Sequence, residues 1–188
     1  MISRRCLLAG AGASLAGAAV SATGAPAFAH HTKLDPKFSP QRVRFFGYDR
    51  GIVVVDTGNH FLYLVEGWGR ARRYGVGVGR AGLSLKGEAI VERKAEWPRW
   101  RPTDNMIRRS PEKYARYAKG MAGGPGNPLG SRALYLYRNG RDTMYRIHGT
   151  TQPWTVGRSV SNGCIRMVNA HVEDLYERVP LGTRVVIL

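Results

Sequence analysis

The chain has 188 residues, with 29 lysines and arginines against 13 acidic residues, a formal net charge of +16, and two cysteines, Cys6 and Cys164. This length is typical of one domain with a hydrophobic core. The composition, with 43% hydrophobic and 22% charged residues, excludes collagen, a coiled coil and a fully disordered chain. So large an excess of base indicates an anionic partner, such as nucleic acid, a membrane or another acidic polymer.

Residues 1–29 have the pattern of an export signal. A short basic start is followed by a run rich in Leu, Ala and Gly and by the small-x-small sequence Ala27-Phe28-Ala29. The run is too short and glycine-rich for a membrane-spanning helix, which needs about 20 apolar residues. Ser-Arg-Arg-Cys-Leu-Leu at residues 3–8 resembles a twin-arginine signal. We therefore expect export to the periplasm, through the twin-arginine route, with an uncleaved N-terminal anchor as the alternative.

Cleavage after Ala29 would leave Cys164 as a lone cysteine. It would remove two of the 29 bases and none of the acids, so that 159 residues would carry 27 bases against 13 acids, a net charge of +14. Cysteines of exported proteins are usually paired. Cys164 is then either a small buried hydrophobic residue or a reactive thiol.

The remaining chain is predicted to be mostly strands and turns. Residues 30–42 lack periodicity and are expected to be a leader segment, with the folded domain at residues 43–188. Apolar runs at residues 52–55 and 61–65 flank the turn sequence Asp-Thr-Gly-Asn and predict a hairpin. Two further strands are expected at residues 71–78 and 88–93.

The second half of the chain continues this pattern after an irregular stretch. Between residues 97 and 130 we expect two short helical turns, one opening with Ser110 as N-cap and Pro111 at the first helical position. Asn139-Gly140 joins two apolar runs and predicts a hairpin. The remaining predicted elements are strands at residues 133–137, 143–147 and 183–188 and an amphipathic helix at residues 171–179. The fold class is therefore mainly β.

His148 and Cys164 are the candidates for chemistry. His148 ends a predicted strand, and Cys164 follows Gly163 in a loop, so that a base and a nucleophile could face each other across a cleft. A free thiol has a pKa of about 8.5, and a nearby imidazole can activate it. A chain with five histidines always offers some such pair. These residues alone therefore leave a structural thiol open.

Two segments resemble the signature of the L,D-transpeptidase catalytic domain, the YkuD family of bacterial cell-wall enzymes. They are Ile-His-Gly-Thr at residues 147–150 and Ser-Asn-Gly-Cys-Ile-Arg-Met at residues 161–167. The resemblance extends from about Val53 to Leu188 and includes Asn-Pro-Leu-Gly at residues 127–130. One departure is Asn162, where several family members have histidine.

The resemblance implies a mixed β-sandwich with a few short helices and acyl transfer through a thioester. Cys164 would be the nucleophile and His148 the base, and the carbonyl of Gly149 would orient the imidazole. Backbone N–H groups of Asn162, Gly163 and Cys164 are suitably placed to stabilise an oxyanion. Ser161, Arg166 and Trp154 are the candidate substrate-binding residues. Arg166 would pair with a carboxylate or only brace the loop, and Trp154 would line the cleft or belong to the core.

The expected donor is a peptidoglycan tetrapeptide stem that loses its terminal D-alanine, and the acceptor is an amine of a second stem or an envelope protein. The alternatives are hydrolysis of the thioester, which would make the chain an L,D-carboxypeptidase, and a non-catalytic wall-binding module. We expect no nucleic-acid partner, no stable membrane span after cleavage, no cofactor and no metal, since the scattered histidines lack ligand spacing. Gly77-x-Gly79-x-x-Gly82 matches a dinucleotide fingerprint in letters only, because no helix is predicted after it.

Overall fold

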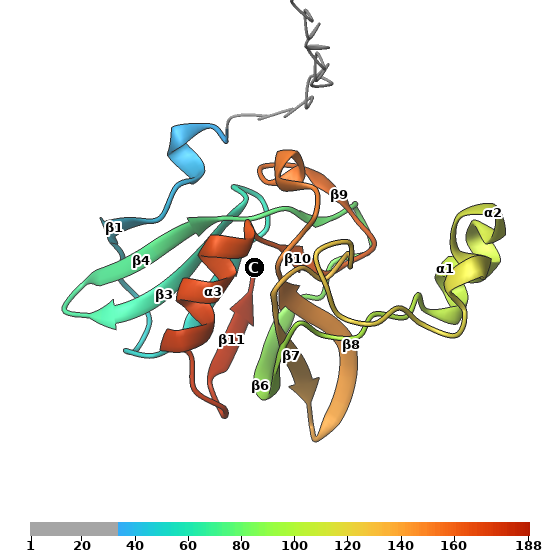
Figure 1. The fold of residues 1–188 in the computed structure, drawn as a ribbon. Helices are drawn as coiled ribbons and strands as arrows, with labels where there is room; N and C mark the ends of the chain where they lie inside the picture. Colours follow the sequence, from blue (N-terminus) through green and yellow to red (C-terminus); the bar gives the residue numbers. More distant parts are fainter. Residues whose placement is uncertain (1–33) are drawn as a thin grey trace, which may run out of the picture. The chain divides into compact units, whose positions relative to one another are not determined.

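The computed structural model describes residues 34–188, which form a mainly β domain (Figure 1). The predicted export signal lies outside these residues. The strands are β1 (Gln41–Arg44), β2 (Val53–Asp56), β3 (Phe61–Gly67), β4 (Arg70–Gly75), β5 (Val78–Gly79), β6 (Gly87–Glu96), β7 (Arg132–Arg138), β8 (Arg141–His148), β9 (Ser159–Ser161), β10 (Ile165–Arg166) and β11 (Arg184–Ile187). The α-helices are α1 (Asp104–Arg109), α2 (Pro111–Tyr114) and α3 (Asn169–Arg178), and 3-10 turns occur at Pro36–Phe38, Ala115–Tyr117 and Pro153–Thr155.

Nine strands form one mixed sheet in the order β1-β4-β3-β2-β11-β6-β7-β8-β10, and β5 pairs with β9 in a second, small sheet. Parallel pairing occurs between β2 and β11, between β8 and β10, and between β5 and β9, while the other pairs are antiparallel. The predicted fold class is confirmed: a mainly β, mixed architecture with a few short helices.

Both predicted hairpins are present. β2 and β3 are antiparallel, and the Asp56 carboxylate accepts the N–H of Asn59 at 2.9 Å within the turn. Asn139 (φ 51°) and Gly140 (φ 70°) both have the left-handed conformation that a tight two-residue hairpin requires.

Burial on both faces explains why β2 begins with three consecutive valines. Val53 and Val55 point into the main cluster, whereas Val54 points to the opposite face and packs in a smaller cluster with Ile52 and Val65. Strand side chains alternate between faces, so a strand covered on both faces needs apolar residues at every position.

The segment predicted to be a leader contributes to the domain. β1 begins at Gln41 and pairs with β4. Phe38 occupies space that a Cβ atom would fill at Gly75 and at Gly157. The absence of periodicity in so short a stretch hid these contacts.

The irregular stretch contains the two expected helical turns. Pro111 opens α2 as predicted, but the Ser110 side chain makes no capping hydrogen bond. Thr103 caps α1 instead, accepting the N–H of Met106 at 3.2 Å. No helix within residues 34–188 has the length and apolar character needed to cross a membrane.

The amphipathic helix predicted near the C-terminus is α3, which packs on β7 and β8. Val172 and Leu175 are buried, and Asp174 contacts β4. Its carboxylate accepts hydrogen bonds from Tyr74 Oη at 2.6 Å and Arg72 Nε at 2.7 Å, and it also binds Arg178. Burial alone would raise the pKa of Asp174, but these hydrogen bonds and cations outweigh it and lower the pKa to about 2.

We expect Asp174→Asn to lower the free energy of unfolding at pH 7 by about 1–3 kcal/mol, because Tyr74 and Arg72 lose a charged acceptor. Because the folded-state pKa is depressed, the contribution of Asp174 is present above its unfolded pKa and is lost as the pH falls from about 4 towards about 2. Urea unfolding at pH 7 and pH 3 measures both effects. Glu177→Gln, at an exposed site on the same helix, is the matched control; equal unfolding midpoints for the two variants would contradict this role.

Candidate active site

Parallel pairing of β10 with β8 brings the two candidate residues together. Ile165 pairs with Ile147 and Arg166 with His148, and Cys164 directly precedes β10. His148 and Cys164 line one cavity of about 200 Å³, which Lys113, Tyr114 and Trp100 also line from the irregular stretch.

His148 is buried and held in one orientation. Its Nδ1 lies 2.5 Å from the carbonyl oxygen of Gly149. A carbonyl can only accept, so Nδ1 carries the proton and Nε2 of the neutral ring is a proton acceptor. Burial lowers the pKa of His148, and the charges of Arg166 and Arg146 lower it further, against opposing hydrogen bonds to Gly149 and Leu129; the pKa is about 4. The imidazole is therefore a neutral base at pH 7.

Two asparagines absent from the predicted site support this orientation. Asn169 Oδ1 accepts the N–H of Thr150 at 3.0 Å, next to Gly149. Asn127 is buried; its Oδ1 accepts the N–H of Leu129 at 2.9 Å and its Nδ2 donates to backbone carbonyls of the irregular stretch. Asn127 lies in a segment that contributed to the family resemblance, but nothing local in the sequence marks Asn169.

Ser161 shapes the loop of the cysteine. Its hydroxyl donates to the carbonyl of Cys164 at 2.7 Å and accepts the N–H of Gly163 at 3.0 Å. Ser161 is buried, and its hydroxyl acts as both a hydrogen-bond donor and an acceptor within the loop. Ser161 therefore holds the loop of Cys164 in shape, and it also lines the cavity; a direct contact with substrate stays a prediction.

Gly163 can only be glycine. It has φ +128°, and a Cβ atom would lie 2.6 Å from both the carbonyl oxygen of Leu83 and the ring of Tyr145. Its N–H is already bound to Ser161. Within the described residues no hydrogen bond occupies the N–H of Asn162 or of Cys164. Of the three predicted oxyanion donors, two are thus available and Gly163 is not.

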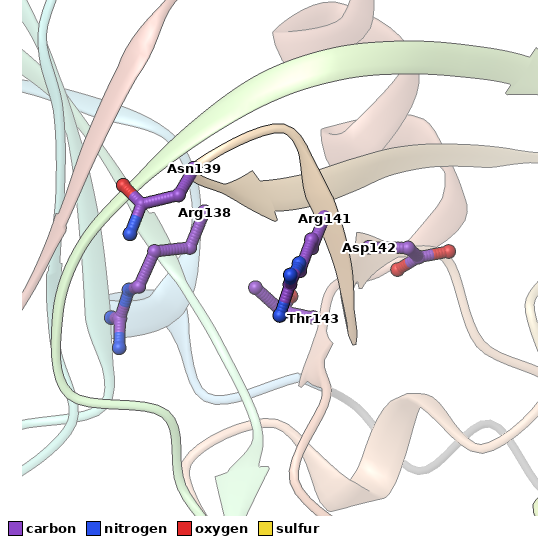
Figure 2. A pocket seen from close by; sticks show the side chains of 5 residues that line it. All are labelled: Arg138, Asn139, Arg141, Asp142 and Thr143. Atoms are coloured by element: carbon purple, nitrogen blue, oxygen red, sulfur yellow. The ribbon is translucent and has the colours of Figure 1, made fainter.

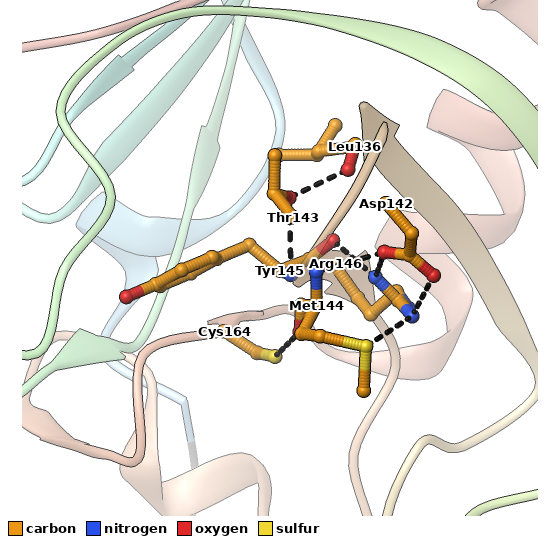
Figure 3. A network of polar contacts seen from close by, with 7 residues as sticks. All are labelled: Leu136, Asp142, Thr143, Met144, Tyr145, Arg146 and Cys164. Carbon is orange, nitrogen blue, oxygen red and sulfur yellow. Dashed lines mark hydrogen bonds and ion pairs between the residues drawn. The ribbon is translucent and has the colours of Figure 1, made fainter. Parts of the chain in front are cut away.

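The Cys164 thiol does not hydrogen-bond with His148 in this structure. Its Sγ donates to the carbonyl of Met144 at 3.8 Å (Figure 3). Burial raises the pKa of Cys164 and outweighs the opposing effects of the Arg146 N–H and the charges of Arg146 and Arg166. The resting pair is therefore a neutral thiol and a neutral imidazole.

The cavity is cationic. Arg166 Nη1 donates to Gln152 Oε1 at 3.2 Å, and the Arg166 backbone exchanges hydrogen bonds of 2.8 and 2.7 Å with Gly77. Lys113 also lines the cavity, and no carboxylate of residues 34–188 does so. An anionic group of a ligand would be attracted here.

The structure does not bring Trp154 to this cavity. Trp154 is half-exposed and lines a separate hollow together with Phe38 and Gly157. Its position in the 3-10 turn after Gln152 directs it towards the N-terminal segment, a contact that the sequence did not suggest. Trp100 is the tryptophan that lines the cavity.

A second hollow in the described part of the chain lacks both candidate residues. Figure 2 shows a shallow hollow at the β7–β8 turn, lined by Arg138, Asn139 and Arg141 among others, which includes neither His148 nor Cys164. Across residues 34–188 no three or more His, Cys, Asp or Glu side chains are grouped as a metal site would require. A Cβ atom at Gly77 or Gly79 would meet Thr155 or Gly163, respectively, and the next element after them is the strand β6.

Comparison with known proteins identifies the family. Residues 50–187 match the family described as the L,D-transpeptidase catalytic domain, YkuD. The chain belongs to this family. The Escherichia coli protein named "Probable L,D-transpeptidase ErfK/SrfK" is 35% identical over 141 residues, which cover 74% of this chain and 44% of that protein. A Fuscovulum blasticum protein, named for an L,D-transpeptidase in the ATP synthase subunits region, is 34% identical over 95% of this chain and 91% of its own length.

Solved structures agree with this assignment of the fold. A Brucella melitensis crystal structure, described as a probable carnitine operon oxidoreductase, is 57% identical with a TM-score of 0.58 and covers 85% of this chain and 99% of its own. An L,D-transpeptidase from Mycobacterium smegmatis has a TM-score of 0.53 at 16% identity, over 73% of this chain and 58% of that chain. The latter similarity shows the fold alone.

We expect alkylation of Cys164 by iodoacetamide in the free L,D-transpeptidase domain to show an apparent pKa above the value of about 8.5 for a free thiol. The reason is that the partly buried thiol is desolvated and donates to a carbonyl. The pH dependence of the labelling rate in a Cys6→Ser background measures this value, and the same protein unfolded in urea is the control. An apparent pKa near 6 would instead indicate a thiolate–imidazolium pair.

Proposed function

We propose that this chain is an exported peptidoglycan L,D-transpeptidase in which Cys164 is the nucleophile and His148 the general base. The observation that carries the proposal is the tethered imidazole: Nδ1 is fixed on Gly149, and His148 lines the same cavity as Cys164. The twin-arginine-like start of the chain supports export to the periplasm.

The chemistry follows from the neutral resting pair. Sγ turns from Met144 towards His148, which takes the thiol proton as Sγ attacks the carbonyl of the third residue of a tetrapeptide stem. The N–H groups of Asn162 and Cys164 stabilise the oxyanion. The C–N bond then breaks, His148 protonates the departing D-alanine amine, and a thioester remains on Cys164.

An acceptor amine completes the reaction. It attacks the thioester and loses a proton to His148, the C–S bond breaks, and the thiol of Cys164 is restored. The product is a 3→3 cross-link between stems or an envelope protein attached to the wall. Cys164 also lines a second hollow, together with Leu83, Thr103 and Arg108 among others, which provides room for an acceptor. This favours transfer over hydrolysis to a tripeptide.

Incubation with defined tetrapeptide muropeptides, followed by mass spectrometry, tests the function. We expect cross-linked dimers from the wild type and none from Cys164→Ala, which should keep the wild-type unfolding midpoint, while Cys6→Ser should be as active as the wild type. Tripeptides alone would identify an L,D-carboxypeptidase. Unchanged substrate with several acceptors would contradict both activities and leave the wall-binding module.

Arg166 is proposed to bind a stem carboxylate. We expect Arg166→Gln to raise the KM for the tetrapeptide by about tenfold or more, because a charge-assisted hydrogen bond contributes about 1.5–3 kcal/mol, with a smaller increase for Arg166→Lys. Steady-state kinetics on the same substrate measure this. Arg158→Gln, in the separate hollow beside Trp154, is the control. A change in kcat with KM unaffected would indicate that Arg166 only braces the loop.

A further inference from the structure

β8 is irregular beside the cysteine. Tyr135 pairs with Arg146 and Tyr137 with Asp142, so three residues of β8 lie opposite the single residue Leu136. Met144, in the middle of this bulge, has φ +64°. Bulges re-aim groups next to active sites, and a non-glycine residue in this conformation costs about 1 kcal/mol or more. Such strain persists only where surrounding contacts hold it.

An ion pair closes the bulge. The Arg146 guanidinium binds Asp142 in bidentate fashion, with Nη1–Oδ1 at 2.6 Å and Nη2–Oδ2 at 2.8 Å (Figure 3). In a regular strand two residues four positions apart are separated by about 13 Å, so this contact depends on the bulge. Asp142 Oδ1 also accepts the N–H of Met144 at 2.8 Å, and Arg146 Nη1 donates to the carbonyl of Tyr145 at 2.9 Å. The pair therefore fixes the backbone between its two members.

The fixed backbone faces the thiol. The Met144 carbonyl accepts the Cys164 S–H and can stabilise only the protonated form. The N–H of Arg146 can stabilise only the thiolate, and it acts to lower the pKa of Cys164, whereas the negative charge of Asp142 raises that pKa. The bulge thus provides a carbonyl that stabilises the Cys164 thiol and an N–H that stabilises its thiolate.

We propose that Asp142 and Arg146 are positioning residues that clamp the β8 bulge, so that Cys164 rests as a thiol on the Met144 carbonyl until substrate turns Sγ towards His148. The inference rests on the proposed role of Cys164 as the nucleophile. Met144 is more than half exposed and lines the cavity, so an arriving substrate can contact this residue. When Sγ leaves Met144, its proton passes to Nε2 of His148.

The clamp contains opposite charges, so its two halves should act on the thiol in opposite directions. Asp142→Asn leaves the positive charge of Arg146 uncompensated, which lowers the apparent pKa of Cys164. Arg146→Gln leaves the Asp142 charge uncompensated and raises it. The other charged or titratable groups around the thiol all remain in both variants: Arg166 on β10, His148 and Tyr145 on β8, Lys113 and Tyr114 on α2, and Arg108 and Arg109 on α1.

The test is the pH dependence of iodoacetamide labelling of Cys164 in the Cys6→Ser chain. We expect labelling at pH 7 to be about three- to tenfold faster in Asp142→Asn and slower by a similar factor in Arg146→Gln, since one pKa unit is a tenfold change. The double variant should return towards the wild-type rate, as expected for coupled residues. Arg93→Gln is the matched control, because Arg93 and Arg146 each lie 4.3 Å from the Tyr135 ring but Arg93 does not hydrogen-bond to Asp142.

Shifts in the same direction for both single variants, or rates equal to that of Arg93→Gln, would overturn the clamp. Should Asp142→Asn fail to fold, Arg146→Lys replaces it: a lysine keeps the charge without the bidentate contact, and the proposal then requires a lower apparent pKa than in Arg146→Gln. Labelling needs no peptidoglycan substrate. If the two variants shift the apparent pKa of Cys164 in opposite directions but the wild-type chain forms no cross-links, the clamp is supported and the proposed function is wrong.

Discussion

The site depends on a two-residue parallel strand pairing. β10 contributes only Ile165 and Arg166, yet it is bound on one side to β8 and on the other to Gly77. This pairing fixes the start of β10, and therefore Cys164, against the end of β8, where His148 lies. Every other feature of the site, including the turn closed by Ser161 and the loop around Gly149, adjusts that placement.

The glycines serve this packing. A Cβ atom at Gly77 would lie 2.5 Å from the carbonyl oxygen of Thr155, and one at Gly79 would lie 2.9 Å from the Cα of Gly163. The two glycines thus allow the β5 segment to approach the cysteine loop closely. These glycines match a dinucleotide-binding motif only in sequence, because other parts of the protein fill the space beside them.

The electrostatics of the site keep its reactive groups neutral until they are used. Burial favours the uncharged forms of both His148 and Cys164, and the cationic surroundings disfavour an imidazolium further. A base that is neutral at pH 7 and tied by Nδ1 is ready to accept a proton at Nε2. The cation that lowers the pKa of the imidazole most, Arg166, is also placed to attract a carboxylate.

Local patterns predicted the parts of the structure that depend on neighbours in sequence. The hairpins at residues 57–60 and Asn139-Gly140 and the apolar face of α3 could be read directly, and the motif around His148 and Cys164 located the cavity. Contacts between segments that are distant in the sequence could not be predicted from local patterns. The support of the Gly149 loop by Asn169, the position of Trp154 beside Phe38 and the internal use of the Ser161 hydroxyl depend on three-dimensional packing. The Asp142–Arg146 pair depends on a bulge that a regular strand pattern hides.

In the proposed reaction the thiol of Cys164 forms a covalent acyl intermediate. Intact-mass measurement of the protein after brief incubation with a tetrapeptide stem, without an acceptor, detects this intermediate, and peptide mapping locates the adduct. We expect a mass increase equal to the acyl group of the stem without its terminal D-alanine, located on Cys164. An adduct on another residue, or product formation by the Cys164→Ala variant, would contradict it.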